Sequence, residues 1–228
     1  MIFSRGILLI TSASILLSCY YLTEKRLRKI HYEGLKNLEE HNYHKLGEIG
    51  EKLLYEAKKY RFPEYESRAN YYLGIFYTGK DDKLAERYFK RMMEIDFTKI
   101  KDKKYEKYYS TSSKGLALFG IAKIRNFEGR SHEAIELLKK AIDYFDECIY
   151  EYVKEFGNDL ACVNQKTTAQ AELSIYLFKL GDRVQAEQYW TEAYTTFKSL
   201  THEYAKRRLS SYCKSVTNYG IKCEDTKN

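Results

Sequence analysis

The chain has 228 residues, of which 44% are hydrophobic, 31% are charged and one is proline, and 39 Lys and Arg against 32 Asp and Glu give a formal charge of +7. This composition excludes collagen-like and low-complexity chains, and a chain of this length can bury a core without a metal or disulfide staple. The positive excess is too diffuse to indicate nucleic-acid binding.

The chain begins with a short basic segment followed by an apolar run. Arg5 is the one charge before residues 7–17, which carry none. The run has the length of a secretory signal and falls short of the roughly 18 residues that a membrane-spanning helix needs. The sequence therefore predicts export.

The end of this run carries a more specific pattern, Leu16-Leu17-Ser18-Cys19. It resembles the lipobox of bacterial lipoproteins, whose cysteine becomes the lipid-modified, palmitate-bearing first residue of the mature chain. The resemblance implies a signal peptide over 1–18, lipidation of Cys19 and a tether over 19–25. Tyr20, in place of the Asp that signals inner-membrane retention, points to the outer membrane, facing the periplasm. A plain secretory signal with a chance cysteine and an uncleaved anchor are the alternatives.

Residues 26–217 show apolar positions at three- and four-residue spacing and no strand-like alternation, which predicts an all-helical domain. The region contains two long predicted helices, Ser131 to Phe156 and Asp159 to Leu180, and ends in a predicted capping helix from Glu203 to Thr217, with a tail over 218–228. Proline and glycine signals predict breaks at 61–63, 79–82, 128–131, 157–159, 181–182 and near Gly220.

Four segments share an internal pattern, with a small residue in a first helix and alanines with an aromatic residue in a second. In the clearest segment, the Gly181-Asp182 turn is followed by Ala186, Trp190 and Ala193. The pattern resembles the tetratricopeptide repeat (TPR), which implies a superhelical solenoid of about four helix pairs plus the capping helix. An irregular helical bundle is the alternative. The segments are 27–60, 67–97, 115–145 and 167–197.

The TPR resemblance also implies a binding surface, because in that family the first helix of each pair lines a concave groove. The partner expected there is another protein or peptide, extended or helical, with acidic groups. The alternative is that overlong helical hairpins, which include the two long predicted helices, pack into the groove and fill part of it. The groove residues carried over are Arg28, His31, Arg68, Tyr71, Ile75, Lys114, Ile121, Arg125, Ile175, Phe178 and Lys179.

Four cysteines remain once Cys19 is set aside, which permits two disulfides in an exported chain. Proximity along the chain favours Cys148 with Cys162 and Cys213 with Cys223. An axial offset of roughly 7 Å across the first hairpin makes the first bond marginal. Buried free thiols are the alternative for both pairs.

No motif for catalysis, metal ligation or cofactor binding stands out, so we expect no enzyme activity, metal or cofactor. His41 and His44 alone have a chelating spacing on a helix, without a further ligand beside them. The lysine-rich run from Lys99 to Lys107 is either a contact for lipid headgroups or acidic partners, or a solvated loop; we favour the loop.

These patterns together favour a lipid-anchored scaffold at the outer membrane that binds another protein. By analogy with lipoproteins of similar build, such a scaffold aids assembly of a pilus, a secretion system or an envelope complex. The alternative is a carrier that binds a small ligand or lipid between helices. A scaffold predicts an open groove with exposed aromatic residues, whereas a carrier predicts a closed apolar cavity of several hundred Å³. The oligomeric state is not predicted.

Overall fold

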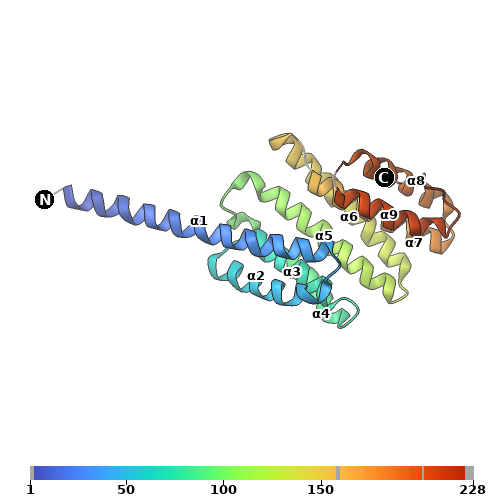
Figure 1. The fold of residues 1–228 in the computed structure, drawn as a ribbon, viewed down its shortest axis with the longest axis horizontal. Coiled ribbons are helices and arrows are strands. Elements are labelled where there is room, and N and C mark those ends of the chain that lie inside the picture. The colour runs from blue at the N-terminus through green and yellow to red at the C-terminus, as the bar shows by residue number, and fades with distance from the viewer. Residues whose placement is uncertain (1–2, 158–159, 202, 224–228) are drawn as a thin grey trace.

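The structure, a computed structural model, describes residues 3–157, 160–201 and 203–223, and within these ranges it contains helices and no strand (Figure 1). Short 3₁₀ turns lie at 43–45, 97–99 and 103–105. The helices are α1 (Phe3–Glu39), α2 (Leu46–Tyr60), α3 (Pro63–Tyr77), α4 (Asp82–Met93), α5 (Glu106–Phe127), α6 (Ser131–Phe156), α7 (Leu160–Leu180), α8 (Arg183–Ser199) and α9 (Glu203–Thr217).

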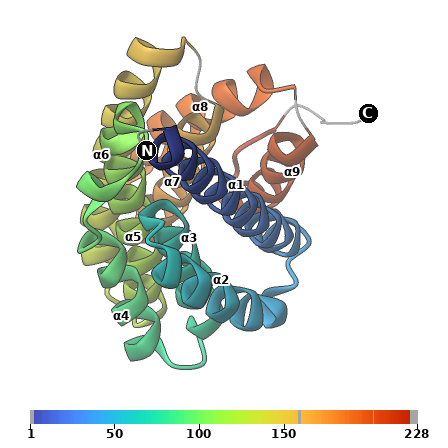
Figure 2. The same ribbon diagram turned by 90° about the vertical axis from the view of Figure 1, so that its left-hand side faces the viewer.

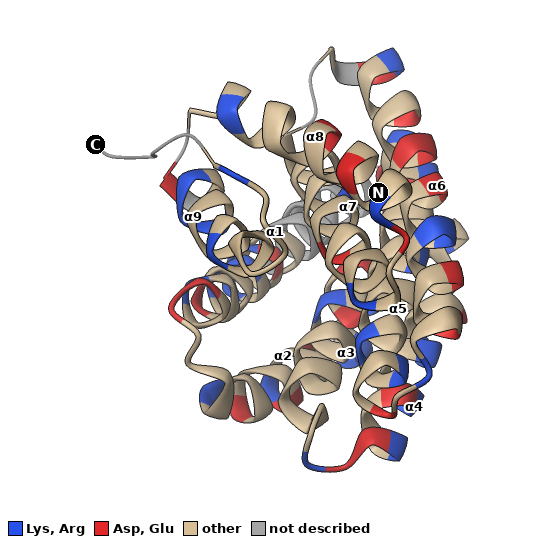
Figure 3. Cartoon of the chain, turned by 90° about the vertical axis from the view of Figure 1, so that its right-hand side faces the viewer, with Lys and Arg blue, Asp and Glu red and all other residues tan. Residues whose placement is uncertain are grey.

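The helices form an inner and an outer layer. Each helix packs against the next, and each odd-numbered helix also contacts the next odd-numbered one, from α1 through α3, α5 and α7 to α9. Viewed from one end, α2, α4, α6 and α8 lie outside this inner layer, and charges of both signs are interspersed along them (Figure 3). Arg207 of α9 lies 3.5 Å from Glu39 of α1. The inner layer therefore curves back on itself.

The turns follow from local chemistry. Arg61 takes a left-handed conformation with φ 61°, and Pro63 opens α3 at a position where no backbone amide is needed. Asp81 and Asp182 cap α4 and α8 by accepting hydrogen bonds from backbone amides. Gly129 supplies the positive φ that ends the α5 hairpin. The predicted breaks at these turns are confirmed. A further predicted break spans 157–159, and its residues 158–159 lie outside the described ranges.

Close approach between helix pairs depends on small residues around one aromatic ring. Phe89 of α4 lies between Gly74 of α3 and Gly120 of α5, and a Cβ built on either glycine would lie 2.5 Å from the ring. Such contacts allow helix axes to come together at native packing density. Alanines on the outer helices are likewise fully buried, namely Ala85, Ala134, Ala141, Ala186 and Ala193.

Two apolar clusters make up most of the core. One is formed by α1 to α3 and the other mainly by α4 to α9, and Tyr71 and Ile75 of α3 contact both. The structure joins Cys148 of α6 to Cys162 of α7, with Cα atoms 6.2 Å apart. It joins Cys213 of α9 to Cys223, with Cα atoms 5.8 Å apart. These are the pairs that chain proximity favours.

Helix α1 runs unbroken from Phe3 to Glu39, through the predicted cleavage position before Cys19 and through the predicted tether (Figure 2). The Tyr20 ring lies 4.8 Å from the ring of Phe62, measured between centroids. Lys101 Nζ lies 3.5 Å from the centroid of Tyr20. The folded body therefore includes Tyr20, next in the chain to Cys19. None of the described helices is long and apolar enough to cross a membrane.

Candidate binding site on the inner helical layer

A pocket of about 540 Å³ lies between α1 from Tyr20 to Tyr32, the start of α3, the loop before α5 and the start of α5. We call it the tyrosine pocket because six tyrosines line it. The rest of its lining is mostly charged, and it opens beside the point where α1 leaves the folded body. The six residues are Tyr20, Tyr32, Tyr65, Tyr105, Tyr108 and Tyr109.

A second, smaller cavity of about 190 Å³ lies further along the inner layer, and we call it the inner cavity. Side chains from α1, α3, α5, α6, α7 and α9 line it, which places it at the centre of the curved layer. Its wall is mainly apolar and aromatic. Its lining includes Leu35, Leu38, Tyr71, Leu116, Phe119 and Thr168.

Arg68 of α3 lines both cavities. Its side chain is half-buried, and among the described residues it forms no hydrogen bond or ion pair. A guanidinium in this position presents its donors to whatever occupies the two cavities, and planar acceptors such as carboxylate or phosphate match its geometry. Arg68 is therefore the best candidate for direct recognition of a ligand.

The other ionisable groups of the tyrosine pocket differ in how they are satisfied. Arg28 donates to Glu24 over 2.7 Å, so these two charges neutralise each other. Glu64 Oε2 is buried without a hydrogen-bond partner. Burial, reinforced by the negative charge of Glu24, raises the pKa of Glu64 to about 7. Burial also raises the pKa of Tyr20 and of Tyr65 to about 12, so both hydroxyls stay protonated at neutral pH.

His31 is a structural part of the pocket wall. The Tyr72 hydroxyl lies 2.8 Å from His31 Nδ1 and donates to the His31 carbonyl oxygen at 3.1 Å. Burial, together with the nearby charge of Arg68, lowers the pKa of His31 to about 3. The imidazole is therefore neutral at physiological pH and contributes no cation to ligand binding.

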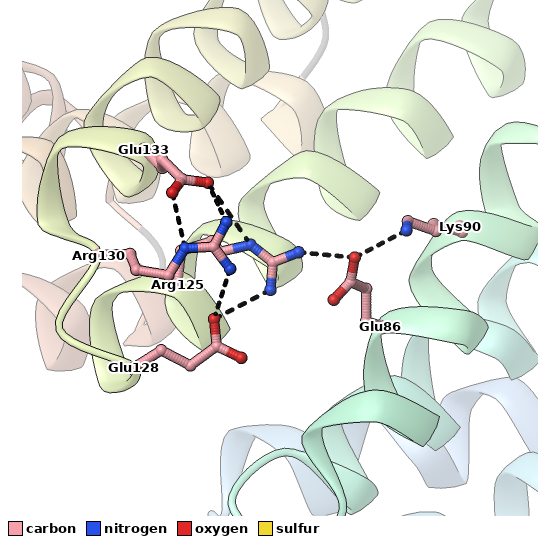
Figure 4. A network of polar contacts seen from close by, with 6 residues as sticks. All are labelled: Glu86, Lys90, Arg125, Glu128, Arg130 and Glu133. Carbon is pink, nitrogen blue, oxygen red and sulfur yellow. Dashed lines mark hydrogen bonds and ion pairs between the residues drawn. The ribbon is translucent and has the colours of Figure 1, made fainter.

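Two predicted groove residues face a different cavity. Ile121 and Arg125 of α5 line an open hollow of about 570 Å³ between α4, α5 and α6. Arg125 donates to Glu86 of α4 over 2.7 Å and lies within a network of charges at the start of α6 (Figure 4). This network neutralises Arg125 and joins α4 to α5. Its other members are Lys90, Glu128, Arg130 and Glu133.

The remaining predicted groove residues contact their own neighbours. Lys114 Nζ lies 5.6 Å from the centroid of Tyr144 on α6. Phe178 is buried and stacks on Tyr219 beyond α9, with ring centroids 5.2 Å apart. Ile175 packs on the core, and Lys179 lies over the neighbouring Tyr176 ring.

Of the predicted groove residues, the tyrosine pocket thus brings together Arg28, His31 and Arg68, while the inner cavity adds Tyr71 beside Arg68.

The site residues that sequence reasoning missed are Glu64 and all six tyrosines of the tyrosine pocket. Tyr105, Tyr108 and Tyr109 have the spacing that places side chains on one face of a helix. The sequence therefore does carry a signal for this part of the pocket. In the described part of the chain, no three His, Cys, Asp or Glu side chains are grouped so that they could hold a metal ion. No known protein family, curated protein or solved structure matches the sequence.

Proposed function

We propose that the chain is a lipid-anchored, TPR-like scaffold that holds a peptide segment of another envelope protein on its inner helical layer. The layered packing of consecutive helix pairs supports the TPR-like part. The contact of Phe89 with Gly74 and Gly120 supports it further, because this is the role that the repeat pattern assigns to its small and aromatic positions.

The anchor in this proposal is the lipid on Cys19, and the absence of an Asp at position 20 favours the outer membrane, with the body facing the periplasm. Acyl chains contribute about 0.8 kcal/mol per buried CH₂, so several chains hold a protein at a membrane far longer than one. Metabolic labelling with a palmitate analogue tests this part. Cys19→Ala should abolish the label while Cys223→Ala retains it, and a labelled Cys19→Ala variant contradicts lipidation at that position.

The observation that carries the peptide-binding part is the unpaired Arg68 at the edge of the inner cavity. A cavity of about 190 Å³ has room for one large apolar side chain and is too small for a lipid chain with its headgroup. The guanidinium beside it pairs with a carboxylate. We therefore expect the ligand to be a peptide with an apolar anchor residue close to an acidic one. The polar, charged wall of the larger tyrosine pocket gives the apolar carrier alternative less support.

Selection from a displayed peptide library against the purified full chain tests this expectation. Enriched peptides should combine an aromatic or aliphatic residue with Asp or Glu, and Arg68→Gln or Tyr71→Ala should weaken them roughly tenfold, the effect of about 1.4 kcal/mol. Arg87→Gln and Tyr55→Ala, which change exposed residues, are the matched controls. Peptides that bind all four variants equally would place the site elsewhere.

A further inference from the structure

The tyrosine pocket contains two opposite charges that other residues leave uncompensated. Glu64 and Arg68 both line it and lie four residues apart on α3, where Cβ atoms are about 5–6 Å apart. Glu64 Oε2 is buried without a hydrogen-bond partner. Arg68 forms no hydrogen bond or ion pair with the described residues. The two charged groups therefore offer separate contacts to a ligand.

The other charges that line the pocket are already satisfied. Glu24 pairs with Arg28 at 2.7 Å, and Asp102 lies 3.3 Å from Lys104. Lys101 Nζ lies over the Tyr20 ring at 3.5 Å. Above the pKa of Glu64, about 7, acidic and basic side chains on the wall balance, three against three without the neutral His31. A ligand of strong net charge gains nothing from such a wall, whereas a zwitterion matches it.

The aromatic wall is suited to the cationic end of a zwitterion. The face of a tyrosine ring attracts an ammonium group, and this attraction strengthens when the site is partly desolvated. Lys101 demonstrates the contact within the chain itself. The six tyrosines of the pocket supply further ring faces and hydroxyl donors.

The spacing of the two uncompensated charges selects among zwitterions. In the described structure Glu64 and Arg68 form no ion pair with each other, unlike Glu24 and Arg28 at the same spacing. A free α-amino acid carries its ammonium and carboxylate on one carbon, closer together than this separated pair favours. A phosphoethanolamine group separates its ammonium from its phosphate by two carbons and an ester oxygen. Phosphate also matches the planar fork of a guanidinium.

We propose that the tyrosine pocket binds a zwitterionic phosphoester headgroup of the phosphoethanolamine type, with the phosphate on Arg68 and the ammonium between Glu64 and the tyrosine rings. The pocket opens beside Tyr20, the residue after Cys19, so in the lipid-anchored state it lies next to the membrane surface. That placement rests on the proposed function; the match of charge and spacing does not. Because Arg68 lines both cavities, the phosphate and the peptide carboxylate compete for its one guanidinium.

Titration calorimetry on the full chain in a maltoside detergent tests the proposal with four soluble probes: O-phosphoethanolamine, dihexanoyl phosphatidylethanolamine, inorganic phosphate and ethanolamine. O-phosphoethanolamine should bind at least tenfold more tightly than inorganic phosphate or ethanolamine. Arg68→Gln and Glu64→Gln should each weaken it about tenfold. Arg87→Gln and Glu48→Gln, at exposed positions, should leave its affinity within twofold. Circular dichroism verifies that each variant is folded.

Each other result overturns part or all of the proposal. Equal binding of inorganic phosphate means a simple anion site, and binding that survives both pocket substitutions places the ligand elsewhere. Binding of O-phosphoethanolamine without binding of its short-chain lipid rejects a membrane lipid as the source. Because every probe is soluble, these results do not depend on the Cys19 lipid, and a failed palmitate label leaves them interpretable.

Discussion

Glu64 shows how a single buried carboxyl couples stability to pH. Its pKa is about 7 in the folded chain, against an ordinary value of 4.5, so the folded state holds its proton more tightly than the unfolded state. The contribution of Glu64 to stability is therefore fully present below pH 4.5 and is lost as the pH rises through 7. We predict that Glu64→Gln stabilises the protein by about 1–3 kcal/mol at pH 8.5 and changes little at pH 4.

Urea unfolding of the parent and the variant at both pH values measures this difference. Glu48→Gln, an exposed position on α2, is the control and should have no pH-dependent effect. A Glu64→Gln effect of equal size at both pH values would mean that the carboxyl is not strained by burial. Glu64 follows Pro63 in the first turn of α3, where an acidic residue ordinarily favours the helix dipole. Sequence alone therefore assigns it to the surface; the walls that bury it come from α1 and α5.

At the scale of the element, the contact of α4 with its neighbours tests the helix packing that the proposed repeats require. Alanine is a better helix former than glycine by about 1 kcal/mol, so Gly120→Ala in an exposed helix would stabilise. Here the new methyl group meets the Phe89 ring, which Gly74 confines from the other side. We predict a net destabilisation of about 1–3 kcal/mol, as for other overpacked cores.

A double-mutant cycle with Phe89→Leu separates this contact from helix propensity. The smaller side chain should relieve the clash, so the cost of Gly120→Ala should be at least 0.5 kcal/mol lower in the Phe89→Leu background, about the threshold for coupled residues. Additive effects would show that α4 and α5 accommodate the methyl group by shifting.

The disulfide between α6 and α7 yields a second prediction at this scale. It closes a loop of 14 residues, for which chain entropy gives roughly 3 kcal/mol. Replacing both Cys148 and Cys162 by serine should lower the free energy of unfolding by about 2–4 kcal/mol, measured in guanidinium. Dithiothreitol should then destabilise the parent more than the double variant. An equal response of both would indicate that the bond contributes nothing.

The bounds of helices were predictable, but the faces they turn inward were not. The ends of α6 and the C-terminal end of α9 agree with the prediction because the glycines beside them, Gly129, Gly157 and Gly220, act locally. On α5, Leu116 and Phe119 face the inner cavity, whereas Ile121 faces the hollow beside α4. Five residues along a helix turn its face by about 140°. Both faces of α5 are apolar, so the packing of α4, α6 and α7 decides which one is inner, and no local signal records it.

For the molecule as a whole, the position of Tyr20 determines how the body sits relative to the proposed anchor. Tyr20 packs on Phe62 at the turn between α2 and α3, so no free tether separates the folded body from Cys19. Helix α1 then extends from Tyr20 to Glu39, about 28 Å at 1.5 Å per residue, toward the opposite end of the body (Figure 1). The turn at Arg61 should therefore lie at the membrane surface, and the start of α8 should lie far from it.

Fluorescence quenching on vesicles measures this orientation. A bimane label on Arg61→Cys should be quenched by nitroxide-labelled headgroups several times more strongly than the same label on Val184→Cys, because nitroxide quenching acts only at short range. Both positions are exposed in the free body, so a difference reflects the membrane alone. Tyr20→Ala is the decisive variant: without its contact to Phe62 the body should tilt freely and the two labels should become more alike. Equal quenching in the parent would mean that the segment after Cys19 detaches from the body at the membrane.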